Sequence, residues 1–273
     1  VVPAEVEPGL RVVLLAVKAH HTPAAIAEIE PLLAEDGCVV SVQNGLNESV
    51  IADAVGEGRT VGCFVNYGAD VMEPGIISRG NRGAVVVGEL DGAHTPRIEW
   101  LHDLFTEFEP DAVLTDNISG YLWGKLAYGA VLFATALEQA SIADVLDDDA
   151  YRPALVAVAR EAMAVAAAVG VRPEPFDGFD PAAFAPDAGE VAAHESLDRL
   201  VVFNRGSAKT HSGVWRDIAV RKRKTEVDAQ IAPIVTLGSD AGVPTPRTAR
   251  LVELVHAVEE GRRPQGRETL SAL

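Results

Sequence analysis

The chain has 273 residues, of which 48% are hydrophobic, and a formal net charge of −17 at pH 7. This length can bury a sizeable core, and the charge argues against nucleic-acid and anionic-membrane partners, which require clustered Lys and Arg. The two cysteines, Cys38 and Cys63, have no C-x-x-C spacing, so we expect a cytoplasmic protein.

The first part of the chain alternates apolar runs of strand length with amphipathic runs. Residues 10–17 (LRVVLLAV) predict a strand that is followed by a helix, and residues 38–42 predict a second strand that is also followed by a helix. Further strands are expected at 60–66, 76–78, 84–87 and 112–114, and a further helix at 98–108. Two strand–helix units in succession favour a Rossmann-like parallel sheet with right-handed crossovers.

After Asp116 the pattern becomes helical. Helices are expected around Lys125 and at 141–146, 151–170, 190–204, 215–238 and 247–261. We therefore predict an α/β domain at residues 1–115 followed by an all-α domain at residues 116–273. Such a pair of domains places a cleft beyond the carboxyl ends of the strands.

Lys125 is the only charged residue between Asp116 and Glu138. On a helix it shares a stripe with Ile118, Leu122, Gly129 and Leu132, which predicts an inward-pointing ammonium group. Desolvation would lower its pKa and suit it to general acid catalysis. The alternative is a structural lysine that reaches the helix edge or pairs with a carboxylate.

Two polar positions follow directly after predicted strands. Lys18 follows the first strand, and Asn44-Gly45 follows the second. Asn44 and Gly45 could offer an amide and a close backbone to a ligand, or they could form an ordinary turn.

A second polar cluster lies between Thr210 and Gln230 and includes Ser212. Glu226 could meet Lys125 across the cleft, but Thr225-Glu226 could equally begin a helix after a break, with Thr225 as its cap. The histidines at 20, 21 and 211 lack partners with metal-ligand spacing, so we expect no metal site.

Four blocks now stand in a recognisable order: Val17-Lys18-Ala19, Gln43-Asn44-Gly45-Leu46, Trp123-Gly124-Lys125-Leu126 and Lys224-Thr225-Glu226-Val227-Asp228. The chain resembles the ketopantoate reductase (2-dehydropantoate 2-reductase) family along essentially its whole length. The resemblance implies a Rossmann domain joined to a helical domain, and reduction of a small 2-oxo acid with NADP(H) for pantothenate biosynthesis. A homodimer is left open.

The resemblance also implies roles for individual residues. Lys125 matches the general acid that protonates the keto oxygen, and Glu226 matches the glutamate that orients substrate and cofactor. Asn44, with Gly45 beside it, matches the asparagine facing nicotinamide and substrate, and Lys18 matches a lysine beside the cofactor. Thr210 and Ser212 are expected near the substrate.

The chain departs from the family pattern at several positions. It has no G-x-G-x-x-G turn to hold a pyrophosphate, and Val1 stands where the family is partway through its Rossmann domain. Gly129 and Phe133 replace two family asparagines, which predicts an open space and an aromatic wall in the substrate pocket. The alternatives are a hydroxy-acid dehydrogenase with a less polar substrate and a dinucleotide-binding or dimerisation protein without turnover.

Overall fold

The computed structural model describes residues 5–80 and 82–273. The chain divides into two compact units. One consists of Val1–Asn66 with Gly83–Leu122, and the other of Tyr67–Arg82 with Trp123–Leu273. The division falls inside a single helix, between Leu122 and Trp123.

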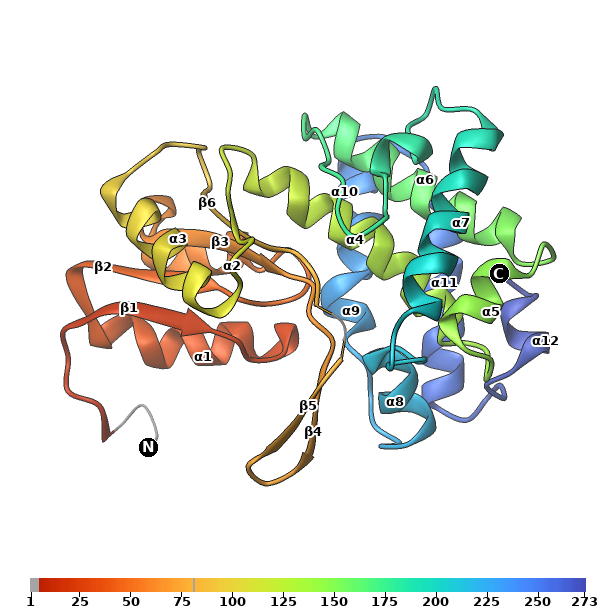
Figure 1. Ribbon diagram of the computed structural model, residues 1–273, viewed down its shortest axis with the longest axis horizontal. Coiled ribbons are helices and arrows are strands. Elements are labelled where there is room, and N and C mark those ends of the chain that lie inside the picture. Colours follow the sequence, from red (N-terminus) through yellow and green to blue (C-terminus); the bar gives the residue numbers. More distant parts are fainter. Residues whose placement is uncertain (1–4, 81) are drawn as a thin grey trace. The chain divides into compact units, whose positions relative to one another are not determined.

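The first unit is built on a five-stranded sheet (Figure 1). Its strands lie in the order β1 (Leu10–Leu15), β2 (Leu33–Ser41), β3 (Thr60–Val65), β6 (Val85–Glu89) and β7 (Val113–Leu114). The first three are parallel, as expected, but β6 runs antiparallel to β3 and β7 runs parallel to β6. The sheet is therefore mixed. An antiparallel neighbour needs no crossover helix, and none separates β3 from β6.

The central strands read as continuous apolar runs because they are buried on both faces. Val40, Val61 and Val87 are completely buried. Helices α1 (Thr22–Ile29), α2 (Glu48–Val55) and α3 (Pro96–Phe108) belong to this unit, with the short 3-10 turns η2 (Ala19–His21), η3 (Glu30–Leu32) and η4 (Glu57–Arg59). One core cluster joins helices α1 and α2 to strands β1 and β2: Leu15, Ile26, Val39, Ile51 and Val55.

A two-stranded hairpin, β4 (Ala69–Glu73) and β5 (Ile76–Arg79), follows β3 in the chain. The sequence indicated β5, and the turn before it contains Gly75, which has a φ of +82°. The sequence did not indicate β4. Val71 and Ile77, which pair across the hairpin, are each 69% exposed. The hairpin therefore lacks the alternation of buried apolar and exposed polar residues by which a strand is recognised in a sequence.

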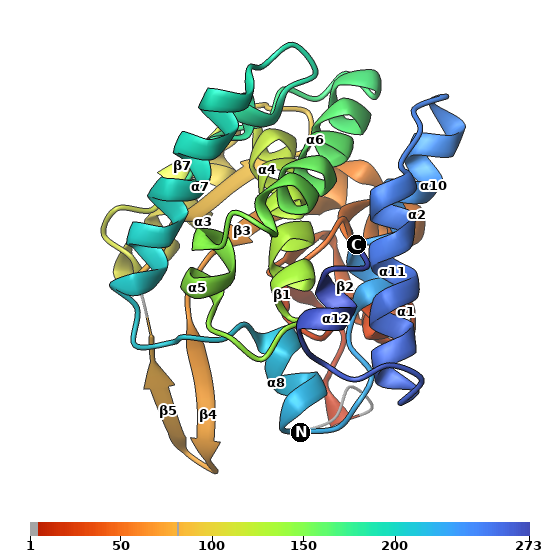
Figure 2. The same ribbon diagram turned by 90° about the vertical axis from the view of Figure 1, so that its right-hand side faces the viewer.

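Apart from the β4–β5 hairpin, the second unit is helical. After the end of α4 (Ile118–Thr135) it contains α5 (Ile142–Asp147), α6 (Arg152–Ala168), η5 (Pro181–Phe184), α7 (Glu190–Arg205), α8 (Gly213–Ala219), α9 (Val227–Gln230), α10 (Ala232–Asp240), α11 (Pro246–Glu259) and α12 (Arg267–Leu270). Helix α6 is central, in contact with α5 and α7 and with α10 and α11 (Figure 2). None of the helices in the described part of the chain is long and apolar enough to cross a membrane.

The expectation of one helical region over residues 215–238 is wrong. The chain breaks between α8 and α9, where Lys222 has a φ of +49°. Asp217 is 3% exposed and accepts hydrogen bonds from Arg221 Nη1 and Arg223 Nε, each at 2.9 Å. A buried carboxylate that binds two nearby guanidinium groups stabilises a turn, which the helical periodicity of the sequence does not reveal.

Candidate functional site

Lys18 lies where β1 ends. It is half-buried, its backbone is extended (φ −60°, ψ 143°), and it immediately precedes η2. The Lys18 carbonyl accepts a hydrogen bond from the His21 amide at 2.8 Å. The chain therefore turns tightly at Lys18 before entering α1.

Asn44 and Gly45 lie where β2 ends and form a tight turn. Gly45 has a φ of +91°, which a residue with a β-carbon rarely adopts. The Asn44 side chain is exposed, and the backbone carbonyl of Asn44 accepts a hydrogen bond from Asn47 Nδ2 at 2.8 Å. The two readings of Asn44-Gly45 are compatible, because the turn leaves the Asn44 amide exposed at the carboxyl end of a strand.

A buried network of hydrogen bonds joins these two strand ends. Gln43 Nε2 donates both to the Val17 carbonyl and to Thr22 Oγ1, each at 2.8 Å. Thr22 Oγ1 in turn donates to Asn47 Oδ1 at 2.9 Å. Sequence analysis missed Thr22 and Asn47 and noted Gln43 only within a motif. The available signal was a set of polar residues directly after apolar strands.

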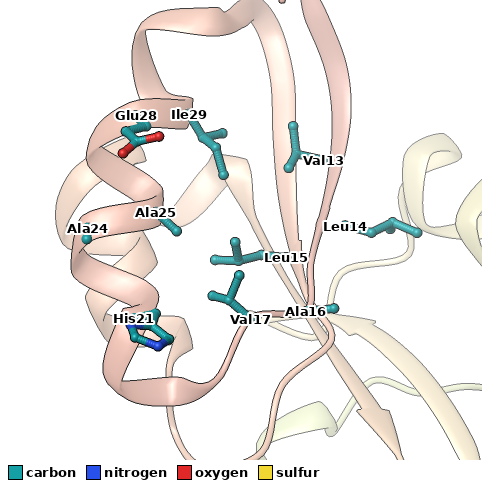
Figure 3. A pocket seen from close by; sticks show the side chains of 10 residues that line it. All are labelled: Val13, Leu14, Leu15, Ala16, Val17, His21, Ala24, Ala25, Glu28 and Ile29. Carbon is teal, nitrogen blue, oxygen red and sulfur yellow. The ribbon is translucent and has the colours of Figure 1, made fainter. Parts of the chain in front are cut away.

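An open hollow of about 660 Å³ lies beside β1 and α1 (Figure 3). Leu15 and Val17 point into it toward α1, whereas Leu14 points to the other face of the sheet (Figure 3). His21 and Glu28 are its polar lining residues. This mostly apolar lining suits an apolar group better than a phosphate.

Lys125 lies on the accessible side of α4. Tyr121, Lys125, Gly129 and Leu132 are half-buried and follow each other at intervals of four, four and three residues. Their neighbours on the other sides of the helix, such as Trp123 and Leu126, are buried. The predicted stripe through Lys125, Gly129 and Leu132 is therefore present. It also leaves room for solvent or a ligand, whereas Ile118 and Leu122, expected on the same stripe, are buried.

Gly129 and Phe133 have different surroundings. A β-carbon built on Gly129 would meet nothing within 4 Å, so the space expected one turn beyond Lys125 exists. Phe133, in contrast, is 1% exposed. The expectation that its ring forms a wall of the substrate pocket is corrected, because position 133 faces the core and not the accessible stripe.

Thr210 and Ser212 lie just before α8. Ser212 is 6% exposed, and its Oγ accepts a hydrogen bond from the Trp215 amide at 3.1 Å, which caps the helix. Thr210 is exposed, and its Oγ1 lies 2.9 Å from His211 Nδ1. Of the two, the Thr210 side chain is the more accessible to a ligand.

Glu226 is half-buried and lies at the start of α9. Thr225 Oγ1 accepts a hydrogen bond from the Val227 amide at 3.2 Å, and the Thr225 amide donates to Glu259 Oε1 at 2.6 Å. The interpretation that a helix begins here after a break is therefore confirmed, but the N-cap residue of α9 is Glu226 and not Thr225, whose hydroxyl stabilises the turn one residue earlier. The position of Glu226 is fixed by its two neighbours in the chain.

A mixed sheet whose first three strands are parallel, with polar residues at its strand ends, followed by a helical unit, is the arrangement of a Rossmann-like domain joined to a helical domain. The sequence model described as ketopantoate reductase PanE/ApbA matches residues 1–92, and that described as ketopantoate reductase PanE/ApbA C terminal matches residues 117–259. The chain belongs to the ketopantoate reductase family. This is a family of NAD(P)H-dependent reductases of small 2-oxo acids.

Individual relatives show the same similarity. The chain is 27% identical to a 2-dehydropantoate 2-reductase of Mesorhizobium japonicum over 274 residues, covering 91% of this chain and 77% of the relative. It is 25% identical to the Archaeoglobus fulgidus 2-dehydropantoate 2-reductase, covering 92% and 77%. The expectation that Val1 enters partway through the Rossmann domain stays a prediction, and the family match begins at residue 1.

Solved structures show the same fold. The 2-dehydropantoate 2-reductase of Geobacter metallireducens has a TM-score of 0.78 at 23% identity, covering 96% of this chain and 80% of that one. A D-mandelate dehydrogenase, solved with NADH and anilino(oxo)acetate, has a TM-score of 0.79 at 20% identity with the same coverage. Enzymes named for different substrates therefore share this fold.

Proposed function

We propose that the chain reduces a small 2-oxo acid to the 2-hydroxy acid, with NADPH as the hydride donor. The observation that carries this proposal is the half-buried Lys125 on the accessible stripe of α4, one turn from the open space at Gly129. A cation held beside an open space can bind the substrate oxygen and deliver a proton to it. Membership of the reductase family supports the same reaction.

Residues of the sheet unit fit part of a dinucleotide. The exposed Asn44 amide and the Lys18 cation both follow strand carboxyl ends, where dinucleotides bind in folds of this type. We propose that Lys18, Asn44 and Gly45 hold the cofactor. When bound, the reduced nicotinamide supplies the hydride.

The chain's own residues complete the reaction. Hydride addition at the keto carbon leaves negative charge on the oxygen, and Lys125 neutralises it by donating a proton. We propose that Glu226 orients substrate and cofactor, and that Thr210 and Ser212 border the substrate. The buried Ser212 hydroxyl already caps α8, so Thr210 is the better candidate for a direct contact.

For the substrate, we propose a 2-oxo acid that is less polar or longer than ketopantoate. The free space at Gly129 supports this choice, because no side chain there can hydrogen-bond a substrate hydroxyl. A second candidate is a hydroxy-acid dehydrogenase that uses NADH. The structural likeness to a D-mandelate dehydrogenase solved with NADH favours this alternative.

Two further expectations concern the state of the protein. Cys38 and Cys63 are both buried and are not joined in a disulfide, which supports a reducing compartment such as the cytoplasm. A similar ketopantoate reductase from Staphylococcus aureus is described as dimeric. We therefore propose a homodimer, which light scattering measures directly.

The proposed reaction is tested by following the oxidation of NADPH and of NADH with a panel of 2-oxo acids. The panel contains ketopantoate, branched aliphatic acids and aryl acids. We expect turnover with NADPH and a higher kcat/KM for the less polar acids. The proposal fails if neither cofactor is oxidised with any acid and neither binds in a fluorescence titration.

A further inference from the structure

We propose that Gln43 is a positioning residue, which holds the Lys18 and Asn44 loops in one fixed arrangement through Thr22 and Asn47. This inference rests on the proposed function, in which Lys18 and Asn44 contact the cofactor. The hydrogen bonds of this network do not use the side chain of Lys18 or the side chain of Asn44. The network therefore acts through the backbone of the two loops.

The amide group of Gln43 connects the two strand ends directly. Its Nε2 binds the carbonyl of Val17, the residue before Lys18, while Gln43 itself precedes Asn44 in the chain. A backbone–backbone hydrogen bond, from the Val42 amide to the Leu15 carbonyl at 2.9 Å, continues the pairing of β1 and β2 up to this point. The side chain of Gln43 thus extends the connection one step beyond the sheet.

Thr22 and Asn47 complete the path to the second loop. The Thr22 hydroxyl accepts a hydrogen bond from Gln43 Nε2 and donates one to Asn47 Oδ1. Asn47 Nδ2 in turn donates to the backbone carbonyl of Asn44. Each donor in this path has one defined acceptor, so reversing the direction of one hydrogen bond would break the next hydrogen bond in the path. The two loops are consequently coupled and cannot move independently without losing buried hydrogen bonds.

Burial makes this coupling strong. Gln43 is 5% exposed, Asn47 is 4% exposed and Thr22 is fully buried, so water cannot replace a lost partner easily. Gln43 Oε1 is also buried and has no hydrogen-bond partner among the described residues. The fold keeps this buried polar atom while both Nε2 hydrogens are in use, which favours a role for the amide beyond filling space.

The test compares variants of the same size. Gln43→Met and Thr22→Val remove the hydrogen bonds but keep the approximate shape, whereas Thr22→Ser keeps the hydroxyl. Thr60→Val is the matched control, because Thr60 is also fully buried in this unit and its Oγ1 donates to the Gly56 carbonyl, away from both loops. For each variant, one measures the thermal midpoint, the dissociation constants of NADPH and NADH, and amide hydrogen exchange at residues 17–19 and 44–47.

We expect Gln43→Met and Thr22→Val to weaken dinucleotide binding about tenfold, as the loss of one buried hydrogen bond allows. Exchange should accelerate in both loops together, while Thr22→Ser and Thr60→Val leave binding and the loops near wild type. Unchanged affinity in both variants, or an equal loss in Thr60→Val, overturns the inference. If the wild type binds neither dinucleotide, the proposed function fails. Amide hydrogen exchange in the variants then tests the positioning network by itself. Acceleration in both loops supports the network, and acceleration in one loop or neither refutes it.

Discussion

The side chain of Ile118 lies directly against the backbone of Gly62. A β-carbon built on Gly62 would fall 2.7 Å from Ile118 Cγ1 and 3.2 Å from its Cγ2. Gly62 lies in the buried strand β3, and Ile118 is the first residue of α4. The start of the helix that carries Lys125 thus packs onto the sheet at a point where only glycine leaves room.

Gly62→Ala should therefore destabilise the protein by about 1–3 kcal/mol, the typical result of overpacking a core. Chemical denaturation measures this change. Gly58→Ala is the control, because a β-carbon at Gly58 would meet nothing within 4 Å. The double variant Gly62→Ala/Ile118→Ala should lose less free energy of unfolding than the two single variants lose together, and strict additivity would contradict the contact.

Lys125→Ala should fold normally and lose about 10²–10⁴-fold in kcat, the usual contribution of a general acid. The reason is the proposed proton transfer from Lys125 to the substrate oxygen. Steady-state kinetics with the best acid of the panel, together with circular dichroism, provide the measurement. A variant that unfolds, or that keeps its activity per folded molecule, would reassign Lys125 to a structural role.

Glu226→Gln should lower kcat while the cofactor dissociation constant changes by less than about threefold, since the amide keeps the shape and one acceptor oxygen. Glu195→Gln, at an exposed position of α7, is the control for loss of one carboxylate from the helical unit. An unaltered turnover number in Glu226→Gln would mean that the carboxylate serves only the structure.

Gly129→Asn should shift substrate preference toward ketopantoate. The side chain fits the open space and restores an amide that can bind a substrate hydroxyl, worth about 1–3 kcal/mol or roughly 5- to 150-fold in relative kcat/KM. Gly129→Ala fills part of the same space without the amide and separates the effect of volume from that of hydrogen bonding. Equal preferences in the two variants would exclude the amide as the cause.

Tyr128 should make the protein unusually sensitive to alkaline pH. Burial raises the pKa of its hydroxyl to about 12 in the folded state, partly offset by the hydrogen bond from Asn204. The tyrosine's contribution to stability is thus complete below about pH 10 and is lost as the pH rises toward 12. Over this range the loss is about 2–3 kcal/mol, and Tyr128→Phe should not show it. Urea titrations of both proteins at pH 8 and above compare them, and parallel curves would contradict the assignment.

Sequence patterns sufficed for much of the fold because its elements have strong periodicity. The buried runs that became β1, β2 and β3 and the long helices α4, α6, α7 and α11 were predicted near their actual positions. The antiparallel direction of β6 was not, because a strand buried on both faces has the same composition in either direction. The break after α8 depends on Asp217 binding two arginines, a tertiary contact that periodicity does not record.

Residues of the candidate site were predictable where a side chain is chemically unusual for its place in the chain. A single lysine in an apolar helix marked Lys125, and a resemblance in four blocks marked Glu226, Lys18 and Asn44. The helical period alone did not separate Phe133 from the stripe, although position 133 lies off the line through 125, 129 and 132. Thr22 and Asn47 were missed because their partners lie 21 and 25 residues away.

The outermost strand of the sheet has a consequence for strand pairing. Among the described strands β1 pairs only with β2, and Leu14 on it is 49% exposed. An open strand edge with apolar side chains can add a strand from another molecule, and natural proteins often block such pairing with a charged residue. Within residues 5–80 and 82–273, β1 therefore offers a place where a further strand can pair with the sheet. Leu14→Lys should weaken the binding of such a strand.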